Sequence, residues 1–484
     1  MRLWPRHKAG RPETDRHETD PHTAEQHTAD AHEAGRPAPG RTTKGSPRSL
    51  PATIVMTLTV ALAVTLTAAL TGAFAPARPS LRSEKAAPAA PHSPQWTATW
   101  GAAMQQATDD ATEDTPNWSR QGFKNETLRQ VIRLSVGGPE LRIRLSNAYG
   151  TKPLHIAGAT VARSDGEAKA RPGTVRTLTF RHAPALTIPA GRDTVSDAVA
   201  MPTANLEKLT VTLRFTTPTG PATMHRFTTA TSYRAPGDRL RSPTADDFNR
   251  RTSHAWYFLT AVDVTQEPPR SADSLMVFGD SLMDGVGTSP DTDNRFSDKL
   301  AERLIAAGRP QGMTNAGLAG DPLLHDSPCF GEKGTARFAK ELRDRAALRT
   351  VFIHLGANDL AQSQQDDPCT RNRPPVTAQQ LIDGHLALVR AAHARGIKAI
   401  GVTILPLRSA VFPFTTPAGD KIRRQLNHWI RTSHTYDAVL DADRVLTDPA
   451  NPNRPRPGYI SQDGLHPSDA GYLALASAVN LTTL

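Results

Sequence analysis

The run Leu-Met-Val-Phe at residues 275–278 constrains the fold of this chain more than any other feature. Four consecutive apolar residues predict a short strand that is buried on both faces, as in a parallel sheet covered by helices. Gly279 ends the run, and Ser281 follows two residues later. A residue just past the carboxyl end of a parallel strand lies where open α/β sheets bind their ligands. Ser281 is therefore either a nucleophile or the N-cap residue of the next helix.

From Asp273 onward the pattern alternates between strands and helices, which predicts a mostly parallel sheet. The sequence predicts strands over 275–278, 350–355, 397–405 and 438–440. It predicts helices over 294–307, 336–347, 378–395, 420–432 and 467–479.

Residues 96–265 have a different pattern and predict an all-β domain. Leu141, Ile143 and Leu145 alternate with polar residues, and residues 209–215 alternate in the same way. A period of two predicts strands with one buried and one solvated face, so we expect a sandwich or jelly roll. The segment Gly137-Gly138-Pro139 predicts a hairpin-like turn.

Six aromatic residues of this region permit two interpretations. They could form a platform that stacks on sugars, or they could pack in the core or at its rim, and the second interpretation is favoured because aromatic side chains mostly pack. These residues are Trp96, Trp100, Trp118, Tyr149, Tyr233 and Trp256.

The first 95 residues predict three segments that lie outside any folded domain. Residues 1–50 are polar and repetitive, with a histidine every five residues from His17 to His32, and we expect a disordered tail rather than a metal-binding tract. Residues 51–75 include the uncharged segment 54–75, which at about 1.5 Å per residue would extend roughly 33 Å. Residues 76–95 are rich in proline and predict an extended spacer.

The uncharged segment is interpreted either as a secretory signal peptide or as an uncleaved membrane anchor. Basic residues precede it, in agreement with the positive-inside rule. Pro76, directly after Ala73-Phe74-Ala75, disfavours cleavage at that point. Both interpretations place everything after residue 76 outside the cytoplasm, either secreted or anchored to the cell membrane. If the segment is not cleaved, it is the chain's only expected membrane contact.

The formal net charge of +10 does not by itself indicate a nucleic-acid partner. The basic excess is spread along the chain, and the sequence shows no basic stripe interleaved with aromatic residues. We therefore expect a solvated basic surface and no nucleic-acid binding.

Three further segments carry residues suited to catalysis. Residues 315–321 (Asn-Ala-Gly-Leu-Ala-Gly-Asp) have glycines that permit close approach of a ligand, although alone they are more typical of an ordinary loop. Residues 356–359 (Gly-Ala-Asn-Asp) follow a predicted strand and could direct an amide donor into a site, or could cap a helix. Asp463 and His466 are spaced so that a turn can bring carboxylate and imidazole together, although a turn aspartate with a surface histidine has the same spacing.

In this order the segments resemble the four sequence blocks of the SGNH hydrolases, the family of GDSL esterases and lipases. The first block is residues 279–282 (Gly-Asp-Ser-Leu), followed by 315–320, 356–359 and 463–466. The resemblance covers residues 273–484 and implies a flavodoxin-like, three-layer α/β/α domain, joined by a linker at 266–272 to the β-domain. Met283 departs from the family pattern, since many relatives have a small polar residue there.

The resemblance implies a role for each site residue. Ser281 would be the nucleophile, His466 the general base and then the general acid, and Asp463 the residue that orients His466. The backbone N–H groups of Ser281 and Gly320 and the side-chain amide of Asn358 would form the oxyanion hole. An isolated serine is a poor nucleophile without a neighbouring base, which agrees with this division of roles. The resemblance implies no cofactor and no metal.

The only two cysteines, Cys329 and Cys369, each follow one of the oxyanion blocks. For an exported domain we expect a disulfide between them, with free buried thiols as the alternative.

The sequence therefore predicts an exported serine ester hydrolase that works through an acyl-enzyme. The stretches 96–101 and 146–150 resemble an amino-terminal domain of secreted SGNH esterases, whose relatives include carbohydrate acetyl esterases. We expect an O-acetyl group on a carbohydrate as substrate. The alternatives are a lipase or arylesterase and, in another class, an inactive glycan-binding module.

Overall fold

The computed structural model describes residues 95–109, 116–248, 251–266, 273–343, 345–362, 369–411 and 414–484, which belong to one compact unit. The predictions for the tail, the apolar segment and nearly all of the spacer concern residues outside these ranges, as do those for 267–272 of the linker. Among the helices of the described ranges, none has the length and apolar character needed to cross a bilayer.

The carboxyl-terminal half contains a parallel sheet, as the alternating pattern predicted, with five strands where the sequence predicted four. Its strand order is β17-β16-β18-β19-β20, so the first strand in the chain lies between the second and the third. This is the flavodoxin-like order, in which ligands bind where the chain switches direction across the sheet. The strands are β16 (Ser274–Gly279), β17 (Gly312–Gly317), β18 (Leu348–His354), β19 (Lys398–Val402) and β20 (Ala438–Leu440).

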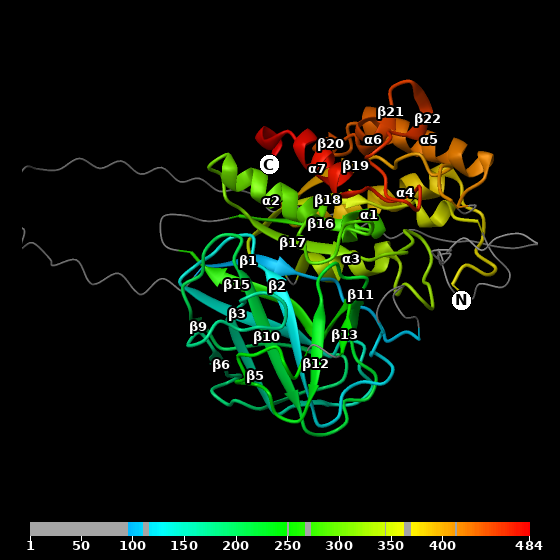
Figure 1. The fold of residues 1–484 in the computed structure, drawn as a ribbon. Helices are drawn as coiled ribbons and strands as arrows, with labels where there is room; N and C mark the ends of the chain where they lie inside the picture. The colour runs from blue at the N-terminus through cyan, green and yellow to red at the C-terminus, as the bar shows by residue number, and fades with distance from the viewer. Residues whose placement is uncertain are drawn as a thin grey trace, which may run out of the picture. The chain divides into compact units, whose positions relative to one another are not determined.

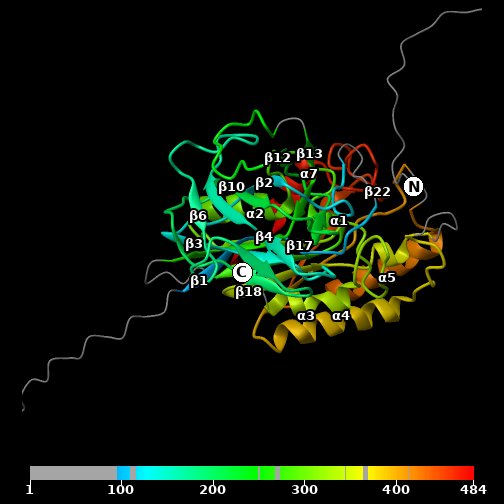
Figure 2. The ribbon, with the colours of Figure 1, turned by 90° about the horizontal axis from the view of Figure 1, so that it is seen from below.

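Helices cover both faces of this sheet, which gives the predicted three layers (Figures 1 and 2). The apolar cluster on one face joins the sheet to α3, α4 and α5, and the cluster on the other face joins it to α2 and α7. The helices and remaining elements are α1 (Ser281–Asp284), α2 (Phe296–Ala306), α3 (Gly334–Arg343), α4 (Ala378–His393), α5 (Pro417–Thr432), α6 (Ala442–Leu446), α7 (Asp469–Ala478), the 3-10 turns η1 (Asn358–Leu360) and η2 (Leu481–Thr483), and the hairpin β21 (Thr447–Asp448) with β22 (Asn451–Pro455).

Helix α4 shows why these segments are helical. Thr377 and Gln380 form a capping box at its start, which pairs two N–H groups that the helix itself leaves unpaired. Buried residues recur at helical spacing along one side, and Gly396 follows the helix with a φ of 66°, a conformation that costs glycine little.

Strand β17 corrects the prediction for residues 315–317, which form the end of an edge strand rather than a loop. Its sequence, Gly-Met-Thr-Asn-Ala-Gly, has few of the residues that favour strands, yet every residue is buried. Strand β1 of the amino-terminal domain covers it, with a bridge between Ala102 and Asn315. Tertiary packing, and not local strand propensity, therefore makes these residues a strand.

The amino-terminal half is an antiparallel β-domain, as predicted. One sheet has the order β1-β15-β3-β8, with β9 also paired to β3, and the other has the order β13-β12-β2-β10-β5-β6. One apolar core joins the two. The strands are β1 (Trp96–Gly101), β2 (Glu126–Arg133), β3 (Glu140–Ser146), β4 (Leu154–Ile156), β5 (Gly158–Arg163), β6 (Arg176–Leu178), β7 (Leu186–Ile188), β8 (Asp193–Val195), β9 (Val199–Ala200), β10 (Lys208–Phe215), β11 (Met224–Arg226), β12 (Ser232–Pro236), β13 (Thr252–Ser253), β14 (Ala255–Tyr257) and β15 (Leu259–Thr265).

Two details of the predicted β-domain are wrong. The turn at Gly137-Gly138-Pro139 does not close a hairpin, because β2 and β3 belong to different sheets. Strand β10 is buried on both faces, not one. Arg129 covers its second face, donating to Thr212 Oγ1 at 3.0 Å, and a small apolar cluster around Phe248 packs on the same side.

The six aromatic residues pack, as the favoured interpretation predicted. Trp100, Trp118, Tyr233 and Trp256 are buried, and the rings of Trp100 and Trp256 meet edge to face with centroids 4.9 Å apart. Trp96 and Tyr149 are partly buried. A sugar-stacking platform from this set is therefore wrong.

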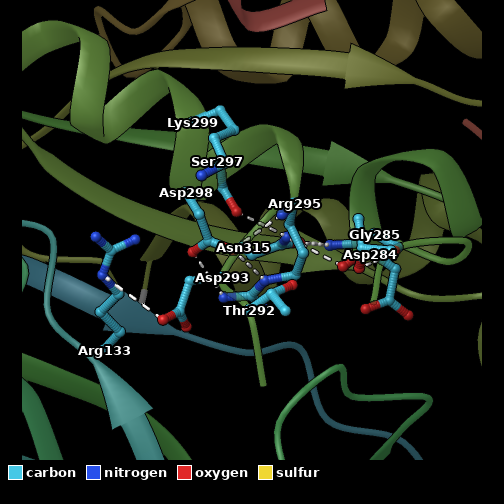
Figure 3. A network of polar contacts seen from close by, with 12 residues as sticks. Arg133, Asp284, Gly285, Thr292, Asp293, Arg295, Ser297, Asp298, Lys299 and Asn315 are labelled. Atoms are coloured by element: carbon cyan, nitrogen blue, oxygen red, sulfur yellow. Dashed lines mark hydrogen bonds and ion pairs between the residues drawn. The ribbon is translucent and has the colours of Figure 1, made fainter. Parts of the chain in front are cut away.

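Polar contacts join the β-domain to the α/β domain. Arg133 of β2 lies 2.7 Å from Glu302 of α2 and 3.8 Å from Asp293, a contact drawn in Figure 3. The N–H of Met313 in β17 donates to Ser135 Oγ at 2.7 Å. The two domains thus share a polar interface beside the nucleophile's strand and helix.

Candidate active site

Ser281 is the first residue of α1, directly beyond the carboxyl end of β16. Asp280, not Ser281, is the N-cap, and its carboxylate accepts from the N–H of Leu282 at 3.2 Å. The alternative role of Ser281 as a capping residue is therefore wrong. A Cβ at Gly279 would lie 2.2 Å from the carbonyl oxygen of His354, so only glycine fits at this position.

His466 lies between Ser281 and Asp463 in a continuous hydrogen-bonded series. Its Nε2 is 2.8 Å from Ser281 Oγ, and its Nδ1 is 2.7 Å from Asp463 Oδ2. Both members of the His–Asp pair are buried, while Ser281 is partly exposed. The predicted spacing of three residues therefore brings carboxylate and imidazole together, and the imidazole reaches a serine 185 positions away.

The local turn explains this placement. Asp463 Oδ1 accepts from the N–H groups of Leu465 and His466 at 2.7 and 2.9 Å, which folds the segment back on its own carboxylate. Burial alone would raise the pKa of Asp463, but the hydrogen bonds from the His466 ring and from these two N–H groups outweigh it and lower the pKa. The carboxylate is thus ionised beside the ring, an arrangement that stabilises a protonated imidazole.

The turn after β17 presents the N–H of Gly320. Within this turn the N–H of Asp321 donates to the carbonyl of Leu318 at 3.0 Å, and that of Ala319 donates to Asp284 Oδ2 at 2.9 Å. The Gly320 N–H has no acceptor within the described ranges. Gly320 has a φ of 84°, which glycine adopts at little cost.

Asn358 follows β18, and its side-chain amide donates to the carbonyl of Asp321 at 3.3 Å. This contact ties the third block to the end of the Gly320 turn. An amide N–H pairs with one acceptor at a time, so the second N–H of the Asn358 side chain is available to another acceptor.

A small cavity lies beside Ser281 and His466. It measures about 20 Å³, room for little more than one water molecule or a methyl group. Asn358 lines it together with apolar side chains that include those of Leu405, Leu407, Phe414 and Leu465. The cavity is therefore small and mostly apolar, with the Asn358 amide as a polar donor in its wall.

Several buried polar residues around this site were not predicted. Asp280 Oδ1 lies 2.9 Å from His354 Nδ1 beneath the serine, and the other side-chain polar atom of each has no partner in the described part of the chain. Arg337 contacts Asp321 at 2.6 Å and donates to the carbonyl of Gly279 at 2.8 Å. Burial raises the pKa of Asp321, and the guanidinium of Arg337 opposes that rise.

Asp284 and His225 form the other unpredicted pair, with 3.0 Å between Oδ1 and Nε2. Asp284 lies two residues after the first sequence block, so its position close to the proposed nucleophile was a usable signal. His225 comes from the β-domain, 59 residues earlier, and no local pattern distinguishes it.

Cys329 and Cys369 form the expected disulfide, with their Cα atoms 5.4 Å apart, and the alternative of free thiols is wrong. No group of three or more His, Cys, Asp or Glu side chains in the described ranges is arranged to hold a metal ion.

Comparisons with known proteins relate the carboxyl-terminal part of the chain to a family of ester hydrolases. Residues 277–474 match the model of the GDSL-like Lipase/Acylhydrolase family. Among solved structures, Est24, a carbohydrate acetylesterase from Sinorhizobium meliloti, is 20% identical, with 43% of this chain and 95% of that chain covered and a TM-score of 0.33. The aryl esterase of M. smegmatis is 22% identical, with 43% and 96% covered and a TM-score of 0.33. The comparison with curated protein sequences finds no match.

Proposed function

We propose, for a chain whose residues 277–474 belong to the GDSL-like lipase/acylhydrolase family, that Ser281 hydrolyses short-chain carboxylic esters through an acyl-enzyme. The family is one of ester hydrolases. The observation that carries the proposal is the contact of 2.8 Å between His466 Nε2 and Ser281 Oγ, continued at 2.7 Å to Asp463.

In the first half of the reaction, Ser281 Oγ attacks the carbonyl carbon of the ester while His466 Nε2 takes the hydroxyl proton. The ring then carries both protons, and the buried Asp463 carboxylate stabilises its positive charge. The carbonyl oxygen becomes an oxyanion. The N–H groups of Ser281 and Gly320 and the Asn358 amide are its proposed donors, each typically worth roughly 3 kcal/mol of the barrier.

Collapse of the tetrahedral intermediate breaks the bond to the alcohol, which takes the proton from His466 Nε2. A water molecule then enters, gives a proton to the same nitrogen and attacks the acyl carbon. Release of the acid returns the proton to Ser281 Oγ. The two halves use the same groups, so kinetics of the ping-pong type are expected.

The size of the pocket supports an acetyl group as the acyl part. The cavity of about 20 Å³ has room for a methyl group, whereas a long acyl chain needs an apolar channel. This favours acetyl esters over the alternative of a lipase acting on long-chain esters.

For the alcohol part we propose a carbohydrate. The support is the resemblance of stretches 96–101 and 146–150 to the amino-terminal domain of secreted SGNH esterases. A small aryl ester is the alternative, since an acetyl-sized pocket accepts either leaving group.

We also propose that the chain acts outside the cytoplasm, because disulfides persist in oxidising compartments and Cys329 and Cys369 form one. Whether residues 51–75 are cleaved or anchor the chain is decided by the mass of the mature amino terminus.

The proposal is tested by ester hydrolysis with the wild type and the Ser281→Ala variant. We expect the wild type to hydrolyse p-nitrophenyl acetate and acetylated xylan, to lose rate from butyryl to long-chain esters, and to lose nearly all activity in Ser281→Ala. A phosphonate probe should label Ser281 alone in the wild type. An inactive wild type would favour the glycan-binding module, and a maximum rate on long-chain esters would favour a lipase.

A further inference from the structure

We propose that His225 of the β-domain is a positioning residue for the ester hydrolysis at Ser281. It holds the carboxylate of Asp284, and through Asp284 it holds the turn that carries the Gly320 N–H. The inference rests on the proposed function, and it gives the β-domain a part in the catalytic rate.

His225 lies in β11 and is 2% exposed. Its Nδ1 is 2.8 Å from the carbonyl oxygen of Ala103, in the segment that follows β1, and its Nε2 is 3.0 Å from Asp284 Oδ1. The ring also packs against Trp256, with centroids 5.5 Å apart. The imidazole is therefore fixed on the β-domain side and directed at α1 of the other domain.

The partners of His225 show where its protons lie. A carbonyl oxygen only accepts, so Nδ1 must carry a proton and donate it to Ala103. Nε2 faces a carboxyl oxygen, and a hydrogen bond there requires a second proton, on the ring or on the carboxyl group. With that proton on the ring, the contact is a charge-assisted hydrogen bond, which is stronger than one between neutral groups.

Asp284 transmits this contact to two parts of the active site. It is the last residue of α1, the four-residue helix that begins with Ser281. Its other oxygen, Oδ2, accepts from the N–H of Ala319 at 2.9 Å. One carboxylate thus connects the nucleophile's helix, the turn before Gly320 and the β-domain.

The backbone of α1 is held independently of His225. Asn315 Nδ2 donates to the carbonyl of Met283 at 2.7 Å and also lies 3.2 Å from Ser297 Oγ. Figure 3 shows Asn315 beside Asp284 and Gly285, with Arg295 on the same side. Loss of His225 should therefore leave α1 in place and free only the carboxylate and the turn that it holds.

Two substitutions separate the two contacts of His225. In His225→Gln the amide nitrogen takes the place of Nε2 and can still donate to Asp284. In His225→Asn the amide nitrogen takes the place of Nδ1 and can still donate to Ala103, but it does not reach Asp284. His155→Gln is the control, because His155 is an exposed histidine of the same domain that contacts Thr187.

We expect His225→Asn to lower kcat about 100-fold with little change in KM, because a displacement of about 1 Å at a reacting centre has an effect of that order. His225→Gln should recover at least a tenth of the wild-type kcat, and His155→Gln all of it. Asp284→Ala should lower kcat about as much as His225→Asn does. The double variant His225→Asn/Asp284→Ala should be no slower than Asp284→Ala alone. Equal losses in the Asn and Gln variants, or additive losses in the double variant, would overturn the proposal.

Amide hydrogen exchange of the peptide spanning residues 317–324 gives a readout that does not depend on activity. It should be faster in His225→Asn than in the wild type or in His225→Gln at matched thermal stability. If the wild type hydrolyses no ester, the proposed function fails, and the exchange result still decides whether His225 holds the turn. Unchanged exchange in His225→Asn would show that it does not.

Discussion

The ring of Phe330 lies directly against Gly320. A Cβ on Gly320 would be 2.3 Å from Phe330 Cδ1, and the φ of Gly320 is 84°. Both constraints favour glycine at the one turn residue whose N–H we assign to the oxyanion hole. The aromatic ring thus forms the rear wall of this turn.

Gly320→Ala should therefore lower kcat about 100-fold or more, because the displaced N–H no longer meets the oxyanion. Gly308→Ala is a matched control, since Gly308 has a φ of 70° and nothing within 4 Å of its Cβ position. Both variants carry the backbone strain, and only the first should lose activity on a short-chain ester. Equal kcat in the two variants would show that the contact with Phe330 is unimportant.

The disulfide lies next to the segments that carry two of the proposed oxyanion-hole donors, the Gly320 N–H and the Asn358 side-chain amide. Cys329 precedes Phe330, and the carbonyl of Cys369 accepts from Arg373 at 3.3 Å, which also donates to the carbonyl of Asn358. The double variant Cys329→Ser/Cys369→Ser should lose up to about 4 kcal/mol of unfolding free energy, given the loop of 40 residues. Its kcat should fall as well, because the segments around Phe330 and Arg373 would be held less firmly.

Urea unfolding and steady-state kinetics on the same preparations test this prediction. Treatment of the wild type with a reductant should reproduce both changes, and the double variant should be insensitive to it. A variant that is less stable but retains the wild-type kcat would limit the disulfide to a stabilising role.

Asp463→Asn should lower kcat by about 10⁴ while the fold is retained, because an amide no longer selects the tautomer of His466 that accepts the serine proton. The lowered pKa of Asp463 means that its stabilising contribution is complete above a pH of about 4 and is lost as the pH falls through the folded pKa. The kcat and the acid limb of a stability profile measure the two effects. Asp383→Asn, on the exposed side of α4, should change neither, and a small loss of kcat in Asp463→Asn would contradict the assigned role.

The geometry of the candidate site could be anticipated in part because each of its parts has a local signal. Ser281 follows an apolar strand and a glycine, and Asp463 and His466 share one turn. The parallel order of the sheet then brings strand ends together that lie far apart in the chain. Each of these local patterns also permits a role outside catalysis, so the resemblance of the four blocks to the SGNH hydrolases was needed to assign the residues to one site.

The features that sequence reasoning missed depend on packing between distant segments. Strand β17 has a weak strand sequence and is decided by the β-domain that covers it, and the second buried face of β10 depends on Arg129. The pair of His225 and Asp284 joins two domains, and a single histidine in a short strand carries no sign of its partner. Alternation likewise identified β3 and β10 as strands but not the sheets to which they belong, because the period is the same for any pairing.

His385 of α4 gives the chain a titratable group inside the α/β core, close to the proposed oxyanion hole. Its Nε2–H donates to the carbonyl of Leu355 at 3.2 Å, just before Gly356 and Asn358, and its Nδ1 accepts from the hydroxyl of Tyr436. The two contacts fit a neutral ring. Burial lowers the pKa of His385 to about 4, against about 6.5 in an unfolded chain.

The direction of the pH effect on stability follows from the difference between the folded and unfolded pKa values of His385. Between pH 6.5 and pH 4 the unfolded chain binds a proton at this position that the folded chain does not, so stability falls as the pH falls. A difference of this size corresponds to about 3 kcal/mol over the whole interval. His385→Gln keeps a donor for Leu355 but does not titrate, so its unfolding free energy should start lower at pH 7 and fall about 3 kcal/mol less by pH 4. His428→Gln, at an exposed position of α5, should retain the wild-type slope, and a wild-type slope in His385→Gln would mean that His385 does not cause the loss of stability in acid.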